Sequence, residues 1–319
     1  GNLPTTPAIL GNVAVWKPAA SALLSNWYVY NLLEAAGLPP GVINFVPGDP
    51  VMVSQLALGS PDLGGIHFTG STGVFQSMWA HVGTNIQKYK SYPRLVGETG
   101  GKDFIMVHPS ADPQEVAVAM VRGAYEYQGQ KCSAASRVYV PKSLWPEVRD
   151  RAVAMMREIK VGDTRDFRNF MGAVIDKKAF DKISGYLADA KQNAKIVAGG
   201  GARGEEGYFI EPTLIESPKA DYRTMCEEIF GPVLSVFVYE DARLDDALAV
   251  GGLESRDRRL GLGQAAGERA GALSDPLLEI AADQQEEDEH ADRLEIHFAD
   301  AGQHLEHRLI DGRIGLADL

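Results

Sequence analysis

Cys132 is the residue whose type and surroundings best suit nucleophilic chemistry. It lies in the segment Gly-Gln-Lys-Cys-Ser at 129–133, which is small and polar and carries a positive charge at Lys131. A nearby cation favours the thiolate, the reactive form of cysteine. A cysteine that follows a helix is nonetheless more often a small buried apolar residue. The other cysteine, Cys226, precedes two glutamates that disfavour a thiolate, and we interpret it as structural.

A carboxylate in a suggestive setting, Glu98, opens the segment Glu-Thr-Gly-Gly-Lys at 98–102. It follows a short apolar strand at 95–96, and the two glycines would let other groups approach closely. A carboxylate at the end of a strand can act as a general base. The simpler interpretation is a turn that carries an exposed glutamate.

Two further segments have features of nucleotide sites. Phe-Thr-Gly-Ser-Thr-Gly at 68–73 joins a predicted strand to a predicted helix. Gly70 would let the backbone approach a ligand, and Ser71 with the helix N-terminus offers donors to a pyrophosphate. Lys17 ends the first predicted strand, where nucleotide sites of parallel sheets lie. Many strand–helix turns contain Gly-Ser, and a lone lysine is most often a surface residue.

The composition limits the class of protein. The chain has 319 residues, of which 45% are hydrophobic and 23% charged, as in a globular protein of about two domains. No apolar run is long enough for a membrane span, and no basic patch suggests nucleic acid. Two cysteines form no disulfide framework, which favours a reducing compartment. No Cys/His cluster has the spacing of a zinc site, so no metal is expected.

The elements that must hold these residues begin with an alternating pattern. Short apolar runs at 13–16, 42–46 and 65–68 predict buried strands. Between the first two, Ser21 can cap a helix that ends at Gly37, and a shorter helix fits 51–58. This order predicts a parallel sheet with right-handed crossovers, the architecture of nucleotide-binding domains.

A second unit begins near Gly97, with a strand predicted at 104–107. Asp112, followed by Pro113 and by a glutamate at the third helical position, predicts a helix start. That helix should run toward Tyr127 and stop at Gly129. Cys132 would then occupy a loop before a strand at 138–140. A further helix is predicted over 144–159 and a strand over 234–239.

The character of the chain changes near Glu240. From there on it carries twenty acidic residues against eight arginines and no lysine, which accounts for the whole net charge of −12. Residues 283–292 form an acidic run typical of a solvated or disordered segment. Four histidines (His290, His297, His304, His307) also lie here; metal ligation is one interpretation and scattered surface histidines the default.

Five segments, in this order and spacing, resemble the aldehyde dehydrogenase family. They are Trp-Lys-Pro at 16–18, Phe-Thr-Gly-Ser at 68–71, Glu-Thr-Gly-Gly-Lys at 98–102, Gly-Gln-Lys-Cys at 129–132 and Glu-Glu-Ile-Phe-Gly-Pro at 227–232. Within that family, segments 92–98, 126–134, 139–146 and 207–213 resemble the 1-pyrroline-5-carboxylate dehydrogenases.

The resemblance implies a fold and a division of the chain. We expect an α/β protein with a parallel-sheet nucleotide-binding domain and an α/β catalytic domain, both incomplete. The partial NAD-binding domain would span 1–97, the partial catalytic domain 98–248, and an atypical acidic tail 249–319. The first residue, Gly1, lies in what reads as packed structure, and the family's oxyanion-stabilising asparagine and N-terminal region would precede it. Beyond about residue 248 the family's later motifs are not recognisable, and we hypothesise that the tail is not homologous sequence.

The resemblance also implies roles for single residues. Cys132 would attack the aldehyde carbon and Glu98 would activate the thiol, the water or both. Gly70 and Ser71 would contact the pyrophosphate and Lys17 the adenosine ribose. Glu228 would hold the nicotinamide ribose with Phe230 packed nearby, and Ser133 would help bind the substrate carboxylate.

Three functions follow as alternatives. The first is NAD-dependent oxidation of glutamate semialdehyde to glutamate in proline breakdown. The second is another aldehyde dehydrogenase activity, and the third an inactive, incomplete product. Ala19 and Ala20 stand where many NAD-preferring relatives carry a carboxylate, so NADP stays an alternative to NAD. The resemblance further implies a small-molecule aldehyde substrate, a homo-oligomer, and a location in the bacterial cytoplasm or the mitochondrial matrix.

Overall fold

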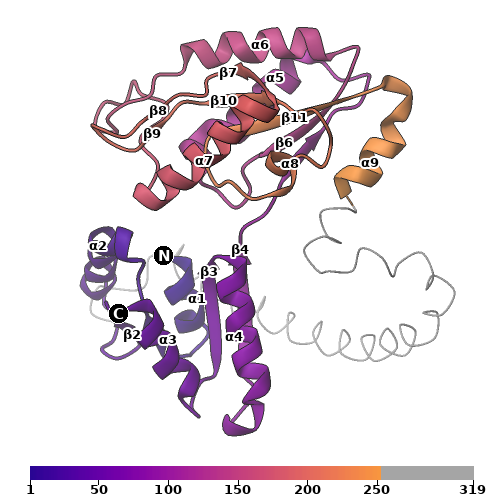
Figure 1. Ribbon diagram of the computed structural model, residues 1–319. Coiled ribbons are helices and arrows are strands. Elements are labelled where there is room, and N and C mark those ends of the chain that lie inside the picture. The colour runs from indigo at the N-terminus through magenta and orange to yellow at the C-terminus, as the bar shows by residue number, and fades with distance from the viewer. Residues whose placement is uncertain (253–319) are drawn as a thin grey trace, which may run out of the picture. The chain divides into compact units, whose positions relative to one another are not determined.

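The computed structural model describes residues 1–252 and has the mixed α/β character that the sequence predicts (Figure 1). The acidic run at 283–292, the four histidines and nearly all of the predicted tail lie outside the described residues. None of the described helices is both long enough and apolar enough to cross a bilayer.

The first ninety-nine residues form short strands that alternate with helices. The elements are α1 (Asn2–Ile9), β1 (Ala14–Trp16), η1 (Ala20–Ala22), α2 (Leu23–Ala35), β2 (Ile43–Phe45), α3 (Pro50–Gly59), β3 (Gly65–Gly70), α4 (Thr72–Thr84), η2 (Ile86–Lys88) and β4 (Arg94–Thr99). All three predicted strands and both predicted helices are present. β1 pairs with β2 and β3 with β4, both in parallel.

The predicted single parallel sheet is two separate ladders in this region. No strand among residues 1–99 pairs with both β1 and β3, so the β1–β2 ladder and the β3–β4 ladder are not joined by hydrogen bonds. Helix α1 contacts strands of both ladders instead. The alternation of the sequence therefore predicted the strands and their parallel direction correctly, but not the continuity of the sheet.

The predicted helix cap at Ser21 is wrong. Ser21 lies inside the 3₁₀ turn η1, and α2 begins after Ala22 without a side-chain cap. The neighbouring Ser25 donates to the Ala22 carbonyl at 2.9 Å. A 3₁₀ turn in front of the helix moves the first turn beyond the reach of the Ser21 hydroxyl. The predicted end is confirmed, because α2 stops at Ala35 and Gly37 adopts a positive φ.

Residues 104–252 contain the larger sheet. Its elements are β5 (Phe104–Met106), α5 (Pro113–Tyr125), η3 (Glu126–Gly129), β6 (Arg137–Pro141), α6 (Trp145–Glu158), α7 (Lys177–Asn193), β7 (Lys195–Ala198), β8 (Ala202–Arg203), β9 (Phe209–Ile210), β10 (Thr213–Glu216), α8 (Arg223–Cys226), β11 (Val233–Tyr239), η4 (Asp241–Arg243) and α9 (Leu244–Gly252). The order is β5-β6-β11-β10-β7, parallel except for the pair of β7 with β10. β8 and β9 form a small antiparallel ladder.

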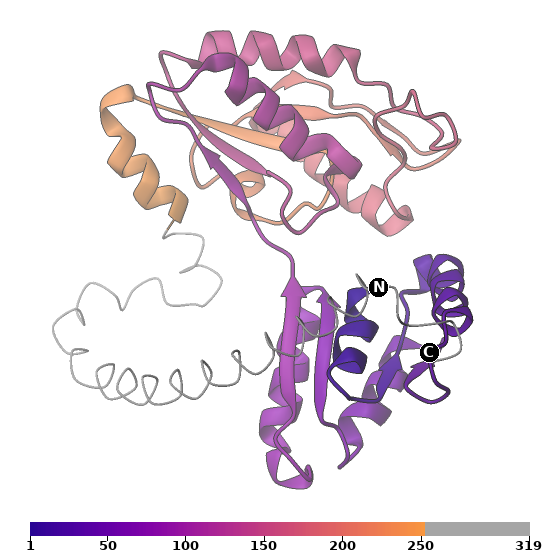
Figure 2. The same cartoon turned by 180° about the vertical axis from the view of Figure 1, so that it is seen from behind.

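Both faces of this sheet are covered. Helix α7 lies in front of the sheet in Figure 1, and α5 lies in front of it in the reverse view of Figure 2. Successive residues of each strand point to opposite faces of the sheet, as the pleat requires. Val138 and Leu234 are buried with α5 and α6, while Ile215 is buried against α7. The near-continuous apolar character of these strands follows from burial on both faces.

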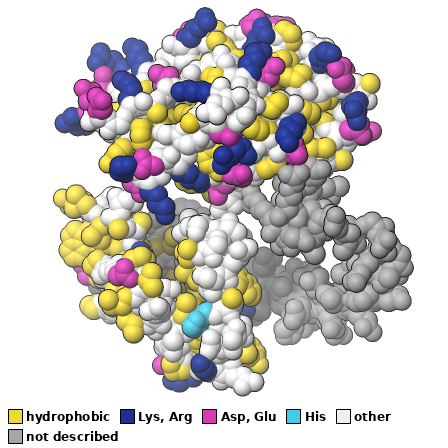
Figure 3. Space-filling model, viewed as in Figure 1, with side chains coloured by type: hydrophobic (Ala, Val, Ile, Leu, Met, Phe, Trp, Pro, Cys, Tyr) yellow, Lys and Arg dark blue, Asp and Glu magenta, His cyan; other side chains and the backbone are white. Residues whose placement is uncertain are grey.

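The core therefore lies in residues 104–250. In residues 1–99 the buried apolar side chains are few, among them Ile43 and Val82, while large ones such as Trp27 and Leu56 are exposed. Figure 3 shows this contrast: apolar side chains gather on the part formed by residues 1–99, whereas most of the charged side chains in view are on the part formed by residues 104–250, interspersed with apolar ones.

Replacing the cap of α5 should destabilise the larger sheet. The Asp112 carboxylate accepts hydrogen bonds from the amides of Gln114 at 2.8 Å and Glu115 at 3.0 Å. We expect Asp112→Ala to lower the free energy of unfolding by about 1 kcal/mol. Asp112→Asn keeps an acceptor at the cap and should stay close to the parent. Urea unfolding followed by circular dichroism measures both, and equal midpoints for Asp112→Ala and the parent would contradict this assignment.

Candidate functional site

Cys132 occupies an exposed turn, as the sequence predicts. The turn is closed by a hydrogen bond from the Ala134 amide to the Lys131 carbonyl at 3.1 Å. Its far end is anchored, because the Ala135 amide donates to the Gly123 carbonyl at 3.0 Å. The thiol is thus open to a reagent, while the backbone on either side of it is tied to the protein.

The helix before this turn ends earlier than predicted. Helix α5 stops at Tyr125, and the backbone then reverses its handedness, with φ of 54° at Tyr127 and 58° at Gln128. Such a conformation is costly for residues with a side chain and persists only where other contacts hold it. Here the buried Gln128 side chain donates to the Ala173 carbonyl at 3.0 Å. A side-chain tether of this kind is not visible in the helical pattern, which is why the predicted end was wrong.

Gly129 lies against the backbone of another segment. A Cβ on this residue would stand 2.4 Å from the Gly231 carbonyl oxygen and 2.7 Å from that of Ala124. Its φ of 65° also belongs to the left-handed region. Only glycine fits this position without strain. The contact brings the segment before Cys132 against the segment that carries Glu228 and Phe230.

Lys131 faces a carboxylate. Its ammonium donates to Glu126 at 2.6 Å, and Glu126 also meets Arg122 at 2.9 Å. The hydrogen bond from Lys131, followed by its charge and that of Arg122, lowers the pKa of the Glu126 carboxyl. The positive charge that the sequence places beside Cys132 is therefore shared with Glu126, which weakens its effect on the thiol.

The segment after Glu98 meets both Cys132 and Glu228. The Gly101 amide donates to the Glu228 carboxylate at 3.1 Å. A Cβ on Gly100 would lie 2.0 Å from that carboxylate, and one on Gly101 would lie 3.2 Å from the Cys132 carbonyl oxygen. The two glycines thus permit the close approach that the sequence suggested, to protein groups from two distant segments.

Glu98 itself is an exposed residue near the end of β4, paired with Thr69 of β3. No hydrogen bond or ion pair joins it to Cys132 in the part of the chain that the structure describes. The strand runs one residue beyond Glu98, so the predicted strand end is confirmed to within one position. The acid–base role remains a prediction.

Phe230 and its neighbours complete a small hollow. Phe230 has a positive φ of 59° and a side chain that is 41% exposed. The hollow is lined by residues of the Cys132 turn and of the segment around Glu228: Gly101, Gly129, Lys131, Ala134, Ala135, Ser136, Glu228, Ile229, Phe230, Gly231 and Val233. Ser133 is exposed in the same turn as Cys132.

The three remaining predicted site residues belong to residues 1–99. Ser71 caps α4, where its hydroxyl accepts from the Val74 amide at 3.4 Å. Gly70 precedes it, and a Cβ there would lie 2.5 Å from the Phe68 ring, so the glycine also makes room for this ring. Lys17 follows β1 and donates to the Pro18 carbonyl. The structure thus brings the Cys132 turn to the segment that carries Glu228 and Phe230, and within residues 1–252 it shows no direct contact from Lys17 or Ser71 to them.

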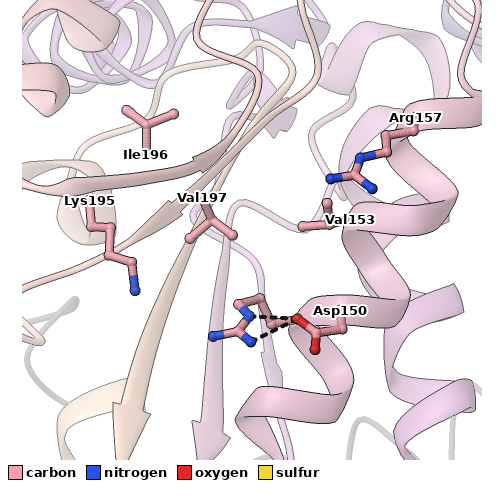
Figure 4. A pocket seen from close by; sticks show the side chains of 7 residues that line it. Asp150, Val153, Arg157, Lys195, Ile196 and Val197 are labelled. Atoms are coloured by element: carbon pink, nitrogen blue, oxygen red, sulfur yellow. Dashed lines mark hydrogen bonds and ion pairs between the residues drawn. The ribbon is translucent and has the colours of Figure 1, made fainter.

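A larger hollow of 370 Å³ lies elsewhere, between α6 and β7 (Figure 4). Its lining contains none of the predicted site residues: Arg149, Asp150, Val153, Arg157, Lys195, Ile196 and Val197. Arg149 pairs with Asp150 at 2.8 Å, and Lys195 pairs with Glu216. The smaller hollow is lined by Glu228 and Phe230 and by Lys131 and Ala134 on either side of Cys132 and Ser133, so we take this region as the candidate site. No group of three or more His, Cys, Asp or Glu within residues 1–252 is arranged to hold a metal ion.

Sequence reasoning missed the side chains that hold the site in place. Gln128 and Gln130 tether the Cys132 turn to residues 173–175, the latter by accepting from the Ile175 amide at 2.9 Å. Arg137 is buried and donates to the Lys102 carbonyl at 3.1 Å. Only the charge of a residue in the apolar strand 137–141 could have marked Arg137, and nothing in the pattern singles out the glutamines.

Comparison with known proteins relates most of the chain to one family. Residues 4–250 match the sequence profile described as the aldehyde dehydrogenase family. Among curated relatives, the mitochondrial delta-1-pyrroline-5-carboxylate dehydrogenase of Dictyostelium discoideum is 48% identical over 253 residues, which are 78% of this chain and 45% of that protein. The human protein of the same name is 46% identical over 251 residues, with the same coverage.

Solved structures agree with the sequence relatives. The delta-pyrroline-5-carboxylate dehydrogenase of Mycobacterium tuberculosis bound with NAD is 49% identical, with a TM-score of 0.72 over 78% of this chain and 46% of that one. The chain spans a little under half the length of the relatives it matches.

A methyl group at Gly129 should disrupt the site. Gly129→Ala must adopt a left-handed φ and also clashes with the Gly231 carbonyl, so we expect it to lower the free energy of unfolding by about 2–4 kcal/mol. Gly185→Ala is the matched control, because Gly185 lies in helix α7 with open space around it. It should raise the free energy of unfolding by about 0.5–1 kcal/mol. If urea unfolding gave Gly129→Ala the midpoint of the parent, the tight contact would not exist.

Proposed function

Because the chain belongs to the aldehyde dehydrogenase family, we propose that it oxidises L-glutamate 5-semialdehyde, the open form of 1-pyrroline-5-carboxylate, to L-glutamate with NAD as hydride acceptor. The observation that carries the proposal is the meeting at Gly100 and Gly101. There the exposed Cys132 turn, the Glu228 carboxylate and the chain that leads from Glu98 come together. The names of the relatives supply the substrate and the cofactor of the proposal.

The reaction assigns covalent catalysis to Cys132. Its sulfur forms a bond to the aldehyde carbon, and the carbonyl oxygen takes up a proton to give a thiohemiacetal. Loss of a hydride from that carbon and of a proton from its oxygen leaves a thioester on Cys132. Glu98 accepts a proton from water, which adds to the thioester carbon and releases glutamate and the Cys132 thiol. An exposed turn suits this sequence, because both aldehyde and water must reach the sulfur.

The residues present fit a dinucleotide. Ser71 caps the thirteen-residue helix α4. Its first amides, Thr72 and Gly73, have no hydrogen-bond partner among residues 1–252 and can donate to a pyrophosphate. The half-buried Glu228 carboxylate can accept from ribose hydroxyls, with Phe230 beside it. Lys17 is assigned to the adenosine ribose. When bound, NAD supplies the acceptor for the hydride.

Substrate recognition is assigned to the Cys132 turn. The Ser133 hydroxyl is exposed next to the nucleophile and can donate to the carboxylate of the semialdehyde. We propose the mitochondrial matrix if the source is eukaryotic and the cytoplasm if it is bacterial. The curated relatives from Dictyostelium and human are named mitochondrial, which supports a mitochondrial location in the eukaryotic case. We also propose that the protein forms homo-oligomers, as the family resemblance implies.

Formation of NADH from pyrroline-5-carboxylate and NAD tests the proposal. The parent chain should form NADH, and Cys132→Ala should reduce the rate to background, since alanine has no nucleophile with which to form the acyl intermediate. Glu98→Gln should slow the rate by about a hundredfold or more.

Cys226→Ala is the matched control, because that thiol lies in α8 and packs against the buried cluster of Tyr139 and Tyr239. It should retain the parent rate. Activity that survives in Cys132→Ala would refute the assignment of the nucleophile. No NADH from the folded parent with either NAD or NADP would refute the proposed function for this chain.

A further inference from the structure

The carboxylate of Glu228 has a defined position before any cofactor binds. It accepts the Gly101 amide at 3.1 Å and lies where a Gly100 side chain would otherwise stand. Side chains of glutamate are flexible, so this position depends on how the backbone of Glu228 is held. The residue after it, Ile229, is buried, and Phe230 has a positive φ, so the turn has little freedom.

Lys182 of helix α7 holds that backbone directly. Its ammonium donates to the Glu228 carbonyl at 2.7 Å, a short charge-assisted hydrogen bond. Lys182 is exposed, and this carbonyl is the one partner the structure gives it within residues 1–252. A lysine on an exposed helix face most often points into solvent or pairs with a carboxylate. Here it reaches across to a backbone oxygen forty-six residues further along the chain.

Tyr186 of α7 also contacts this turn. One helical turn beyond Lys182, the Tyr186 hydroxyl donates to the Glu227 carboxylate at 2.6 Å. Arg223 stacks over the Tyr186 ring at 4.4 Å and meets Glu227 at 3.2 Å. The hydrogen bond from Tyr186 lowers the pKa of the Glu227 carboxyl despite partial desolvation, so this carboxylate stays charged at neutral pH.

Lys182 and Tyr186 are four residues apart and therefore lie on one face of the helix. Lys182 binds the backbone carbonyl of Glu228 and Tyr186 binds the side chain of Glu227, so they hold two consecutive residues of the turn. Between them, Ile183 packs so closely that a Cβ on Gly231 would lie 2.5 Å from its terminal carbon. Helix α7 thus holds the turn at three places: the Glu228 carbonyl, the Glu227 side chain and Gly231.

We propose that Lys182 is a positioning residue for cofactor binding. By fixing the Glu228 carbonyl, it orients the Glu228 carboxylate toward Gly101 and so prepares it for the nicotinamide ribose. Without the ammonium, the peptide between Glu228 and Ile229 can rotate and the carboxylate leaves Gly101. The inference rests on the proposed function for the role of Glu228, whereas the effect of Lys182 on the turn does not.

Three variants of the whole chain separate these steps. Lys182→Met keeps the aliphatic stem and removes the ammonium. Lys182→Arg keeps a cation that can reach the carbonyl. Lys178→Met is the matched control, because Lys178 is exposed on the same helix and makes no hydrogen bond or ion pair with any residue in the described range 1–252.

Hydrogen exchange of the Gly101 amide reports whether the Glu228 carboxylate stays bound to it, and it can be measured without any cofactor. Lys182→Met should speed this exchange about fivefold and weaken NAD binding by a similar factor. In the NADH assay the KM for NAD should rise while kcat at saturating NAD changes little. Lys182→Arg should restore the parent values, and Lys178→Met should match the parent throughout. If Lys182 had only a structural role, Lys182→Met would lower the stability of the protein without raising the KM for NAD at constant kcat.

The outcomes distinguish the inference from the function on which it rests. Unchanged Gly101 exchange in Lys182→Met overturns the positioning role, whatever happens to NAD. NAD binding that weakens in Glu228→Gln but not in Lys182→Met overturns the inference alone. NAD binding that is unchanged in Glu228→Gln overturns the proposed role of Glu228, and with it the functional part of the inference.

Discussion

The candidate site depends on backbones that approach too closely for side chains. Gly129 faces the Gly231 carbonyl at a distance that excludes a Cβ, and a Cβ on Gly100 would displace the Glu228 carboxylate. Cys132 and Glu228 are almost a hundred residues apart in the chain, and Glu98 precedes both. Their common site exists because glycine at these positions removes the steric barrier. The hydrogen bond from Gly101 to Glu228 then fixes the distance between the segments.

Much of the local structure could be predicted because its causes are local. Asp112 caps α5 through its own side chain, and the apolar runs that became β1, β3 and β11 are bounded by turn residues. The failures have non-local causes. The 3₁₀ turn displaced the cap expected at Ser21, and the tether of Gln128 to Ala173 ended α5 early. Neither the 3₁₀ turn nor the Gln128 hydrogen bond produces a periodic pattern in the sequence.

The site residues were predicted from their positions in a family pattern. The structure places some of them near one another and leaves others apart. It brings Glu228 and Phe230 to a hollow that Lys131 and Ala134 of the Cys132 turn also line, and it places Ser71 at a helix start, which suits an anion. It also changes one argument, because the Lys131 charge meets Glu126 rather than standing free beside the thiol. The residues that hold the site, Lys182 among them, were invisible to the pattern because their contacts are to backbone atoms far along the chain.

The central claim is that Cys132 carries the acyl group during turnover. Rapid acid quenching of the reaction with pyrroline-5-carboxylate and NAD, followed by peptide mass spectrometry, tests it most directly. We predict that the Cys132 peptide carries the added mass of a glutamyl thioester while NADH forms, and that the Cys226 peptide remains unmodified. NADH formation with an unmodified Cys132 peptide at every quench time, or an acyl group on Cys226, would contradict it.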